Sequence, residues 1–357
     1  MASDGSSVDV FGYRAVINNS DVIAVSAHGD DDAGESAGAI YVFNPTEGGG
    51  YSEIKLNLSD GETQVNLGHN SLSMNSLGLI AASTYDGDRL YIFTPDGGGG
   101  YTEAKLVASG GNGFDGNVSI NDAGIVFVNR SNSLASIYTS DGFGSYTELQ
   151  LAAPDTNSTF SINGVVADDG TIVVSSMIAL YVHEPDGSSN YVISKRPICT
   201  GADGTALAVN EAGVIVVGAK NIPLQDGATT FGSAGGAYVY VPDGSGGYTE
   251  YLLTAVDATG GDTFGFVLSI NEGSVITVGS RDDDDKGPNS GSVYVFTPDE
   301  DGNYVGFDGT VYEPSNTPVE LQTFDSTSLT FNGSEAAEVL KEMAGMTLFL
   351  GEQEMIG

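Results

Sequence analysis

A strand-like motif, in which a tyrosine stands between hydrophobic residues, recurs six times along the 357 residues and constrains the fold more than any other feature. It reads Ala39-Ile40-Tyr41-Val42-Phe43 in the first copy and Val293-Tyr294-Val295-Phe296 in the last. The six tyrosines are 43 to 57 residues apart, and a second tyrosine follows each one after 10 residues, or after 8 in one copy. The pairs are Tyr41 and Tyr51, Tyr91 and Tyr101, Tyr138 and Tyr146, Tyr181 and Tyr191, Tyr238 and Tyr248, and Tyr294 and Tyr304. Internal repetition with such a period is typical of solenoids and propellers.

Each repeat contains the signals of four short antiparallel strands. Between the paired tyrosines lies a turn such as Pro95-Asp96-Gly97, in which Pro presets φ and Gly accepts a positive φ. Upstream, runs such as Val118-Ser119-Ile120-Asn121 and Ile125-Val126-Phe127-Val128 flank another turn, and their β-branched residues suit strands that are buried on both faces. The repeat therefore predicts four-stranded β-sheets rather than helical units.

Radial stacking would make such sheets stable. A single four-stranded sheet leaves both faces in water, whereas sheets arranged around an axis cover one another. We therefore expect an all-β protein, a six-bladed β-propeller of four-stranded antiparallel blades rather than a seven-bladed one. Closure of the ring needs face packing between the first and last blades, or a strand from beyond residue 306. The predicted blades span 8–60, 61–107, 108–152, 153–197, 198–255 and 256–306.

Residues 307–357 break the pattern and form a predicted small C-terminal α+β appendage. The segment Ser334–Met343 reads as a short helix with Ser334 as its N-cap, and Thr347–Leu350 suits a strand. A segment this small does not fold well alone, so it either packs on the propeller or docks to a partner as an anchor.

The charge balance excludes some partners. The chain has 48 Asp and Glu against 11 Lys and Arg, a formal net charge of −37. Such a surface repels nucleic acid and anionic lipid, so we expect neither nucleic-acid binding nor membrane insertion. It suits high salt, as in a marine setting, and divalent cations. Cys199 is the single cysteine, so no intrachain disulfide is possible, and Met1–Gly5 has no features of a signal peptide. We expect folding in a cytoplasm.

Short motifs within the repeats resemble a known family. Phe264-Gly265 precedes the strands of the last blade, Phe11-Gly12 begins the first, and Val216-Val217-Gly218-Ala219 lies in the fifth. These pieces resemble the FG-GAP repeat of integrin-α-like β-propellers, over residues 8–306. The repeats also look like repeat regions in tail-fibre and other virion proteins of marine bacteriophages. That second resemblance implies a virion component that is assembled in a host cytoplasm.

The FG-GAP resemblance also implies candidate metal ligands. Loops of this family often hold calcium through an Asp-x-Asp-x-Asp-Gly pattern, because hard cations need several oxygen ligands from one tight loop. Two loops here are comparably acidic, although neither matches the family spacing. The candidate calcium ligands are Asp30, Asp32 and Glu35 in the first blade and Asp282 and Asp284 in the last. The alternative is that these loops are acidic because they are solvated. We expect no other cofactor.

No sequence pattern indicates catalysis. The three histidines, His28, His69 and His183, fall at different positions of different blades, which argues against a repeat-based metal site. The chain has no Gly-x-Ser-x-Gly, no His-Glu-x-x-His and no phosphate-binding glycine loop. We therefore expect no enzyme, with a carboxylate-based glycosidase or lyase as the alternative.

Three functions follow from these observations. The first is a non-enzymatic structural or binding module on a phage virion, in a tail, fibre or capsid, that mediates assembly or host attachment. Residues 307–357 would contact other virion or surface proteins, and the propeller would contact a host receptor or glycan. The second is a calcium-stabilised adhesion protein that is extracellular or on a cell surface. The third is a carbohydrate-active enzyme.

Overall fold

A computed structural model of the whole chain gives the fold. The structure describes residues 2–109, 113–130, 134–142, 144–151, 163–176, 179–187, 191–197, 206–226, 229–306, 308–314 and 322–324. These residues include no helix that is long and apolar enough to cross a membrane.

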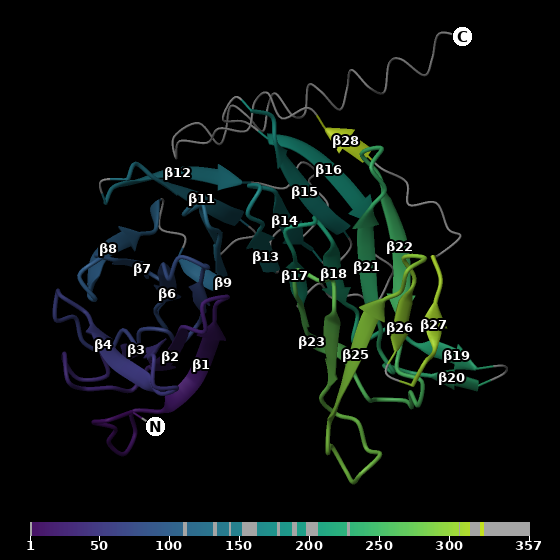
Figure 1. Cartoon of the computed structure of the whole chain (residues 1–357), viewed down its shortest axis with the longest axis horizontal. Coiled ribbons are helices and arrows are strands. Elements are labelled where there is room, and N and C mark those ends of the chain that lie inside the picture. The colour runs from purple at the N-terminus through teal and green to yellow at the C-terminus, as the bar shows by residue number, and fades with distance from the viewer. Residues whose placement is uncertain are drawn as a thin grey trace.

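Six antiparallel sheets follow one another along the chain, and we call them blades 1 to 6 (Figure 1). In each of them the strands are hydrogen-bonded in chain order, from an inner strand at the axis to an outer one. The first three blades are β1 (Phe11–Ile17), β2 (Ile23–Ala27), β3 (Ala39–Pro45) and β4 (Tyr51–Asn57); β5 (Leu72–Met74), β6 (Ile80–Ser83), β7 (Arg89–Pro95) and β8 (Tyr101–Val107); and β9 (Phe114–Ile120), β10 (Val126–Arg130), β11 (Leu134–Ser140) and β12 (Tyr146–Leu151).

The last three blades carry additional strands. Blade 4 gains the outer strand β28 (Gln322–Phe324), blade 5 is interrupted by a hairpin of β19 (Leu224–Asp226) and β20 (Thr229–Phe231), and blade 6 gains β27 (Val311–Tyr312). Their other strands are β13 (Asn163–Val166), β14 (Ile172–Ser175), β15 (Ala179–Pro185) and β16 (Tyr191–Pro197); β17 (Leu207–Val209), β18 (Ile215–Gly218), β21 (Ala237–Pro242) and β22 (Tyr248–Leu253); and β23 (Phe264–Ile270), β24 (Ile276–Ser280), β25 (Ser292–Pro298) and β26 (Tyr304–Gly306).

Packing between blades follows the alternation around each repeat tyrosine. Tyr91 of blade 2 packs towards blade 1, in a core cluster with Ile40, Val42 and Leu56. The residues on either side of Tyr91, Leu90 and Ile92, point the other way and pack against blade 3. Because each β-strand of this kind buries both of its faces, its sequence reads as a continuous apolar run, as expected.

A ladder of asparagines links the turns between the first two strands of neighbouring blades, except that blade 4 has Ala167 at the equivalent position. The Asn75 side chain accepts a hydrogen bond from Leu79 N (2.8 Å) and donates one to the Asn121 carbonyl of the next blade (2.8 Å). Asn121 does the same with Ile125 N (2.8 Å) and the Ala167 carbonyl (2.8 Å). Each such amide therefore closes its own turn and joins two blades near the axis. The sequence shows these asparagines, but their contact with the next blade depends on the tertiary fold.

The Phe-Gly motif has a backbone explanation. Gly12 and Gly265 have φ of 95° and 90°, a region that glycine enters without steric cost. Both lie where the register of the inner strand shifts, so each marks a β-bulge. Beside each bulge the phenylalanine ring meets the repeat tyrosine edge-on, with Phe11 5.3 Å from Tyr41 and Phe264 5.2 Å from Tyr294.

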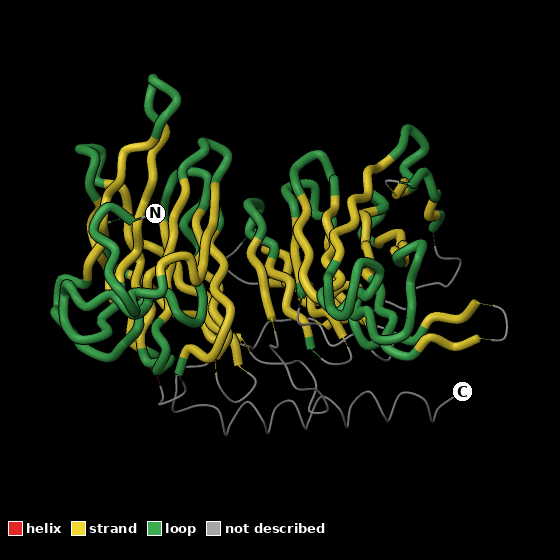
Figure 2. The backbone as a smooth tube through the Cα atoms, turned by 90° about the horizontal axis from the view of Figure 1, so that it is seen from below, coloured by secondary structure: helices red, strands yellow, loops and turns green. Residues whose placement is uncertain are grey.

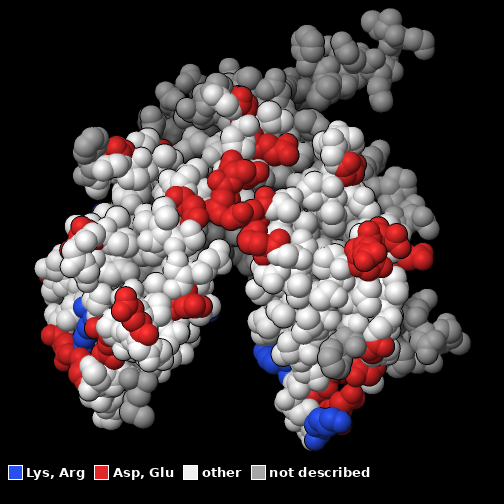
Figure 3. Space-filling model, in the orientation of Figure 1, with Lys and Arg blue, Asp and Glu red and all other residues white. Residues whose placement is uncertain are grey.

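The six blades form an open ring. Figure 3 shows a cleft between blade 1 and blade 6, and no face packing between the described residues of these two blades closes it. Figure 2, seen from below, shows the same separation between the two groups of strands. Of the two expected routes of closure, face packing between the first and last blades is thus not found among the described residues, and the described strands beyond residue 306, β27 and β28, pair within blade 6 and with blade 4. Closing a ring requires the small rotation between neighbouring blades to sum to a full turn, and no local sequence pattern specifies that rotation.

The start of the predicted appendage is partly described. β27 pairs with β26 as a fifth strand of blade 6, and β28 pairs with β16 at the outer edge of blade 4. The predicted helix Ser334–Met343 and strand Thr347–Leu350 lie outside the described residues.

Candidate functional site

The acidic loop of blade 1 connects β2 to β3 and is built around its own carboxylates. Asp31 Oδ1 accepts a hydrogen bond from Ser36 N (2.6 Å), and Asp30 Oδ1 accepts one from Asp32 N (3.1 Å). The Asp30 carbonyl accepts a further bond from Gly38 N (2.9 Å) at the far end of the loop. These bonds turn Asp30 inwards, where only 2% of it is exposed.

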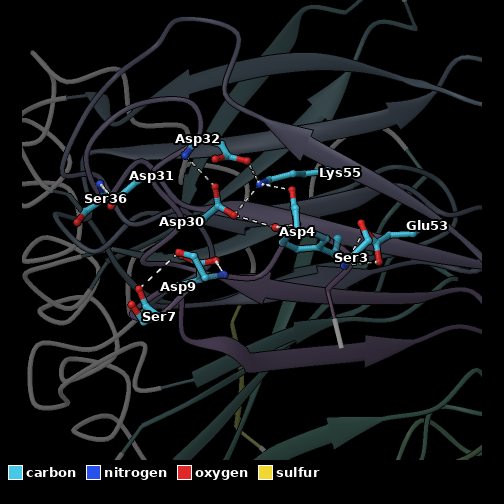
Figure 4. A network of polar contacts seen from close by, with 12 residues as sticks. Ser3, Asp4, Ser7, Asp9, Asp30, Asp31, Asp32, Ser36, Glu53 and Lys55 are labelled. Atoms are coloured by element: carbon cyan, nitrogen blue, oxygen red, sulfur yellow. Dashed lines mark hydrogen bonds and ion pairs between the residues drawn. The ribbon is translucent and has the colours of Figure 1, made fainter.

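A lysine occupies the centre of this carboxylate cluster (Figure 4). Lys55 of the outer strand β4 places its Nζ 2.9 Å from Asp4, 2.8 Å from Asp30 and 2.6 Å from Asp32. The ammonium also lies over the ring of Tyr41, 5.1 Å from its centroid, in a cation–π contact. The Tyr41 hydroxyl donates hydrogen bonds to Asp4 (2.7 Å) and Asp30 (2.8 Å).

The charges in this cluster stabilise one another. The hydrogen bond from Lys55 is the main cause that lowers the pKa of Asp4. Burial alone would lower the pKa of Lys55, but its hydrogen bonds with Asp30 and Asp32 outweigh that effect and raise it. Burial is the main cause that raises the pKa of Tyr41. The cluster therefore holds the Lys55 ammonium among three carboxylates, at the position where the sequence predicted calcium.

Blade 6 repeats this loop without the lysine. Tyr294 donates hydrogen bonds to Asp257 (2.7 Å) and Asp283 (3.0 Å), as Tyr41 does to Asp4 and Asp30. Asp283 Oδ1 accepts a bond from Asp285 N (3.1 Å), as Asp30 does from Asp32 N.

In blade 6, the residues equivalent to the blade 1 loop carboxylates lie one position later in the sequence than the predicted ligands. Asp283, not Asp282, corresponds to Asp30, since each lies 11 residues before its repeat tyrosine. Asp284 corresponds to the loop-forming Asp31, because it accepts a bond from Asn289 N (2.7 Å). Asp282 is held by Arg281 (3.0 Å) and by the Thr263 hydroxyl (3.0 Å).

The remaining candidate, Glu35, is exposed and forms no ion pair among the described residues. Sequence reasoning also missed Asp4 and Asp257, which lie before the blades and reach the loops through space. A comparison of the two segments by their distance from the repeat tyrosine would have found both.

Unlike the carboxylates of blade 1, which form ion pairs with Lys55, those around the repeat tyrosine of blade 6 have no paired cation among the described residues. The hydrogen bond with Asp257 is the main cause that raises the pKa of Asp285, and the charges of Asp257, Asp283 and Asp262 add to it. Among the described residues, no cation forms an ion pair with these four carboxylates. The same part of the chain contains no group of three or more His, Cys, Asp or Glu side chains that could hold a metal ion. Calcium binding in blades 1 and 6 therefore stays a prediction.

The tyrosine–lysine pair is a feature of several blades. In blade 2, Lys105 lies over Tyr91 (5.7 Å) and forms an ion pair with Asp60 (2.8 Å). In blade 4, Lys195 lies over Tyr181 at 5.9 Å. In each case the lysine is the direct cross-strand partner of the tyrosine, as Lys55 is of Tyr41. The outer strand thus supplies a cation to the tyrosine in blades 1, 2 and 4, whereas Glu148 stands opposite Tyr138 in blade 3 and Leu252 opposite Tyr238 in blade 5.

A second acidic region surrounds the axis, where Figure 3 shows acidic side chains near the centre of the face. It lines a pocket of about 260 Å³ that includes Asp122, Asp168, Glu211 and Glu272. The charge of Glu272 is the main cause that raises the pKa of Glu211. Two of these carboxylates have a structural role between neighbouring blades. The Asp168 carboxylate accepts a hydrogen bond from Asp122 N (2.7 Å), and the Glu272 carboxylate accepts one from Glu211 N (2.9 Å).

Two histidines meet between blades 1 and 2, which the sequence did not indicate. The rings of His28 and His69 are 4.8 Å apart and contact Tyr13 and Tyr85. Burial, followed by the charge of His69, lowers the pKa of His28. His183 lies apart from them, fully buried in blade 4.

Comparisons with known proteins agree with the fold. The FG-GAP repeat family model matches residues 1–43 and 250–296, which contain most of the two end blades. A streptogramin B lyase structure has a TM-score of 0.51 at 14% identity, covering 86% of this chain and 91% of the other. Virginiamycin B lyase from Staphylococcus aureus has a TM-score of 0.51 at 12% identity, covering 87% of each chain.

A putative 6-phosphogluconolactonase from Bacteroides fragilis has a TM-score of 0.52 at 12% identity, covering 88% of this chain and 87% of the other. At these identities the neighbours show the fold alone. No curated protein matches the chain. The FG-GAP repeat model thus matches parts of the two end blades, and the structural neighbours show a propeller-like fold for this chain.

Proposed function

We propose that this protein is a non-enzymatic structural or binding module whose end blades join it to a larger assembly. The observation that carries the proposal is the exposure of Val293 (72%) and Val295 (37%), which flank the repeat tyrosine of blade 6. The residues that flank the tyrosine in blades 1, 2, 4 and 5 are fully buried against the next blade. They are Ile40 and Val42, Leu90 and Ile92, Leu180 and Val182, and Ala237 and Val239.

Further apolar residues line the cleft from both sides. Val267 lies on the same face of blade 6 as Val293 and is 57% exposed, and Ile17 at the inner edge of blade 1 is 61% exposed. Apolar surface that neighbouring units cover elsewhere in a repeat protein indicates a site of association. Uncovered, it carries a free-energy cost of about 25 cal/mol per Å².

The assembly that we propose is a phage virion, in which the protein is a tail, fibre or capsid-associated component. The acidic composition, the single cysteine and the resemblance to virion repeats support this role. Residues 307–357 would anchor the propeller, and the propeller would face a host receptor or glycan. An extracellular adhesion protein stabilised by calcium is the second candidate, and the uncompensated carboxylates of blade 6 favour it.

Two measurements test the proposal. Mass spectrometry and immuno-electron microscopy of purified phage particles should find the native chain on the particle surface, and its absence from particles would refute the virion role. A Val267→Asp variant should fold normally, because its side chain is exposed, and should fail to incorporate. Val107→Asp, at an exposed position of blade 2, is the matched control and should incorporate like the wild type.

An enzyme of carbohydrate chemistry is the remaining alternative. The axis pocket supports it, because Glu211 and Glu272 bring two carboxylates together there. Purified protein should release no sugar or unsaturated product from a panel of acidic and neutral polysaccharides. Turnover that a Glu211→Gln substitution abolishes would overturn the non-enzymatic proposal.

A further inference from the structure

Blade 6 lacks half of its outer strand. In blade 1, β4 pairs with all seven residues of β3, from Ala39 opposite Asn57 to Pro45 opposite Tyr51. In blade 6, β26 pairs only with Phe296, Thr297 and Pro298. Among the described strands, none pairs with Ser292–Val295 on that side of β25. The first half of β25 is therefore an open edge, with backbone groups that can accept another strand.

A cavity of about 590 Å³ runs beside this open edge. Its apolar lining includes Val293, Val295 and Tyr312, and its acidic lining includes Asp257, Asp285 and Asp308. Lys286 also lines the cavity, but it is exposed and forms no ion pair among the described residues. The lining of this space is thus partly apolar and partly acidic.

Blade 1 shows what fills the equivalent space in a complete blade. There, Ile54–Asn57 of β4 cover the edge, and Lys55 lies opposite Tyr41 with its ammonium between Asp4, Asp30 and Asp32. Blade 6 keeps the tyrosine and the carboxylates but has neither the strand nor the lysine, because β26 ends at Gly306.

We propose that the open edge of β25 binds an extended segment of a partner protein that carries a lysine, which completes blade 6 by β-strand addition. Main-chain hydrogen bonds to Ser292–Val295 would provide affinity, and the lysine would lie over Tyr294 and beside Asp257, Asp283 and Asp285. Charge complementarity selects the lysine, since the carboxylates of Asp257, Asp283 and Asp285 gather around Tyr294 and form no ion pair with a cation among the described residues. The proposal rests on the binding function proposed above and names the contact through which it acts.

The course of the chain favours a partner protein over the chain's own tail. After Gly306 the backbone reverses, so that β27 pairs with the outer side of β26 and not with β25. The Tyr312 hydroxyl fixes this hairpin by donating to the Thr254 carbonyl (2.6 Å). The next described strand, β28, lies at the outer edge of blade 4, where it pairs with Ile193–Lys195. Both described strands beyond Gly306 thus lie away from the open edge.

A fluorescent peptide tests the proposal on the full-length protein. The probe is Glu-Ile-Lys-Leu-Asn-Leu-Ser, the sequence of residues 53–59, which includes the segment that covers the same edge in blade 1. Fluorescence anisotropy at low salt should show saturable binding. Norleucine in place of the lysine should weaken binding at least tenfold, and so should Asp257→Asn combined with Asp285→Asn in the protein. Asp96→Asn, at an exposed hairpin tip of blade 2, should leave binding unchanged.

A second probe separates strand addition from simple charge attraction. The same peptide with methylated backbone amides keeps its lysine but cannot donate main-chain hydrogen bonds, so it should lose at least tenfold in affinity. Equal binding of the methylated peptide, equal binding of the norleucine peptide, or no binding at millimolar concentration would each overturn the proposal.

One variant identifies the chain's own tail as a competing occupant. If the wild type does not bind the peptide but a Lys341→Gln variant does, the tail fills the edge, and the partner proposal is wrong. If these peptide experiments fail, the incorporation of Val267→Asp into particles still tests the proposed function separately, because Val267 does not line this cavity. The two proposals can therefore fail independently.

Discussion

His183 should make the folded protein sensitive to mild acid. It occupies the second position after the repeat tyrosine of blade 4, where other blades have Phe43, Phe93, Tyr240 and Phe296. The His183 side chain is fully buried, and burial lowers its pKa from 6.5 to about 4 although backbone contacts oppose the shift. In the unfolded chain the imidazole takes up a proton first, so stability is complete above pH 6.5 and falls as the pH falls towards 4.

The size of the effect follows from that shift. Each pKa unit corresponds to about 1.4 kcal/mol, so the whole shift is roughly 3 kcal/mol, of which roughly 2 kcal/mol is lost between pH 7.5 and 5. Replacement by phenylalanine, the residue of the equivalent position in three other blades, should remove this loss. Urea denaturation of the wild type and His183→Phe at both pH values measures it, because the contributions of all other titrating groups cancel in the comparison.

A reciprocal variant provides the control. Phe93→His places an imidazole at the equivalent buried position of blade 2, where 2% of the side chain is exposed, and should create a second acid-sensitive site of similar size. Equal losses of stability in the wild type and His183→Phe between pH 7.5 and 5 would refute the reasoning. His183 would then titrate alike in the folded and unfolded states.

Three further predictions follow from the structure. Asn75→Ala removes a turn-closing bond and an inter-blade bond, so it should lower the free energy of unfolding by about 2 kcal/mol, and a urea midpoint within error of the wild type would contradict the ladder. Lys55→Met leaves the buried Asp30 without its ammonium and should lower that free energy by about 3 kcal/mol at pH 7. Lys105→Met should have a smaller effect, because 28% of the Asp60 side chain is exposed. If blade 6 binds calcium, millimolar Ca²⁺ should raise Tm, EDTA should reverse the rise and Asp283→Asn should abolish it, whereas a Tm unmoved by either reagent speaks against the site.

The strands could be predicted because several local signals agree at each of them. Tyr41, Tyr91 and Tyr181 stand in apolar runs, and the turns between strands carry Pro, Asp and Gly at the positions that such turns require. Six repeats of this kind leave few alternatives to stacked sheets. The opening between blades 1 and 6 could not be predicted, because it depends on small rotations that add up over the whole ring.

The acidic site was harder to predict for a different reason. Asp282, Asp283, Asp284 and Asp285 are consecutive, so composition alone cannot say which of them turns inwards. The distance from Tyr294 resolves this ambiguity, since the strand direction fixes which carboxylate meets the tyrosine hydroxyl. Asp257 comes from a separate segment before the blade, and only the fold brings it to the site.

The scarcity of basic residues makes the position of the lysines informative. The chain has 11 Lys and Arg against 48 Asp and Glu, so a lysine scattered at random would find carboxylates almost anywhere. Yet Lys55, Lys105 and Lys195 stand at one equivalent position, opposite the repeat tyrosine on the outer strand. The same position holds Glu148 in blade 3 and Leu252 in blade 5, so the lysine accompanies the tyrosine in three of the five blades that have a full outer strand. Blade 6 has the same tyrosine and a matching group of carboxylates but no lysine opposite the tyrosine, so we expect a cation from outside the described blade to take that place.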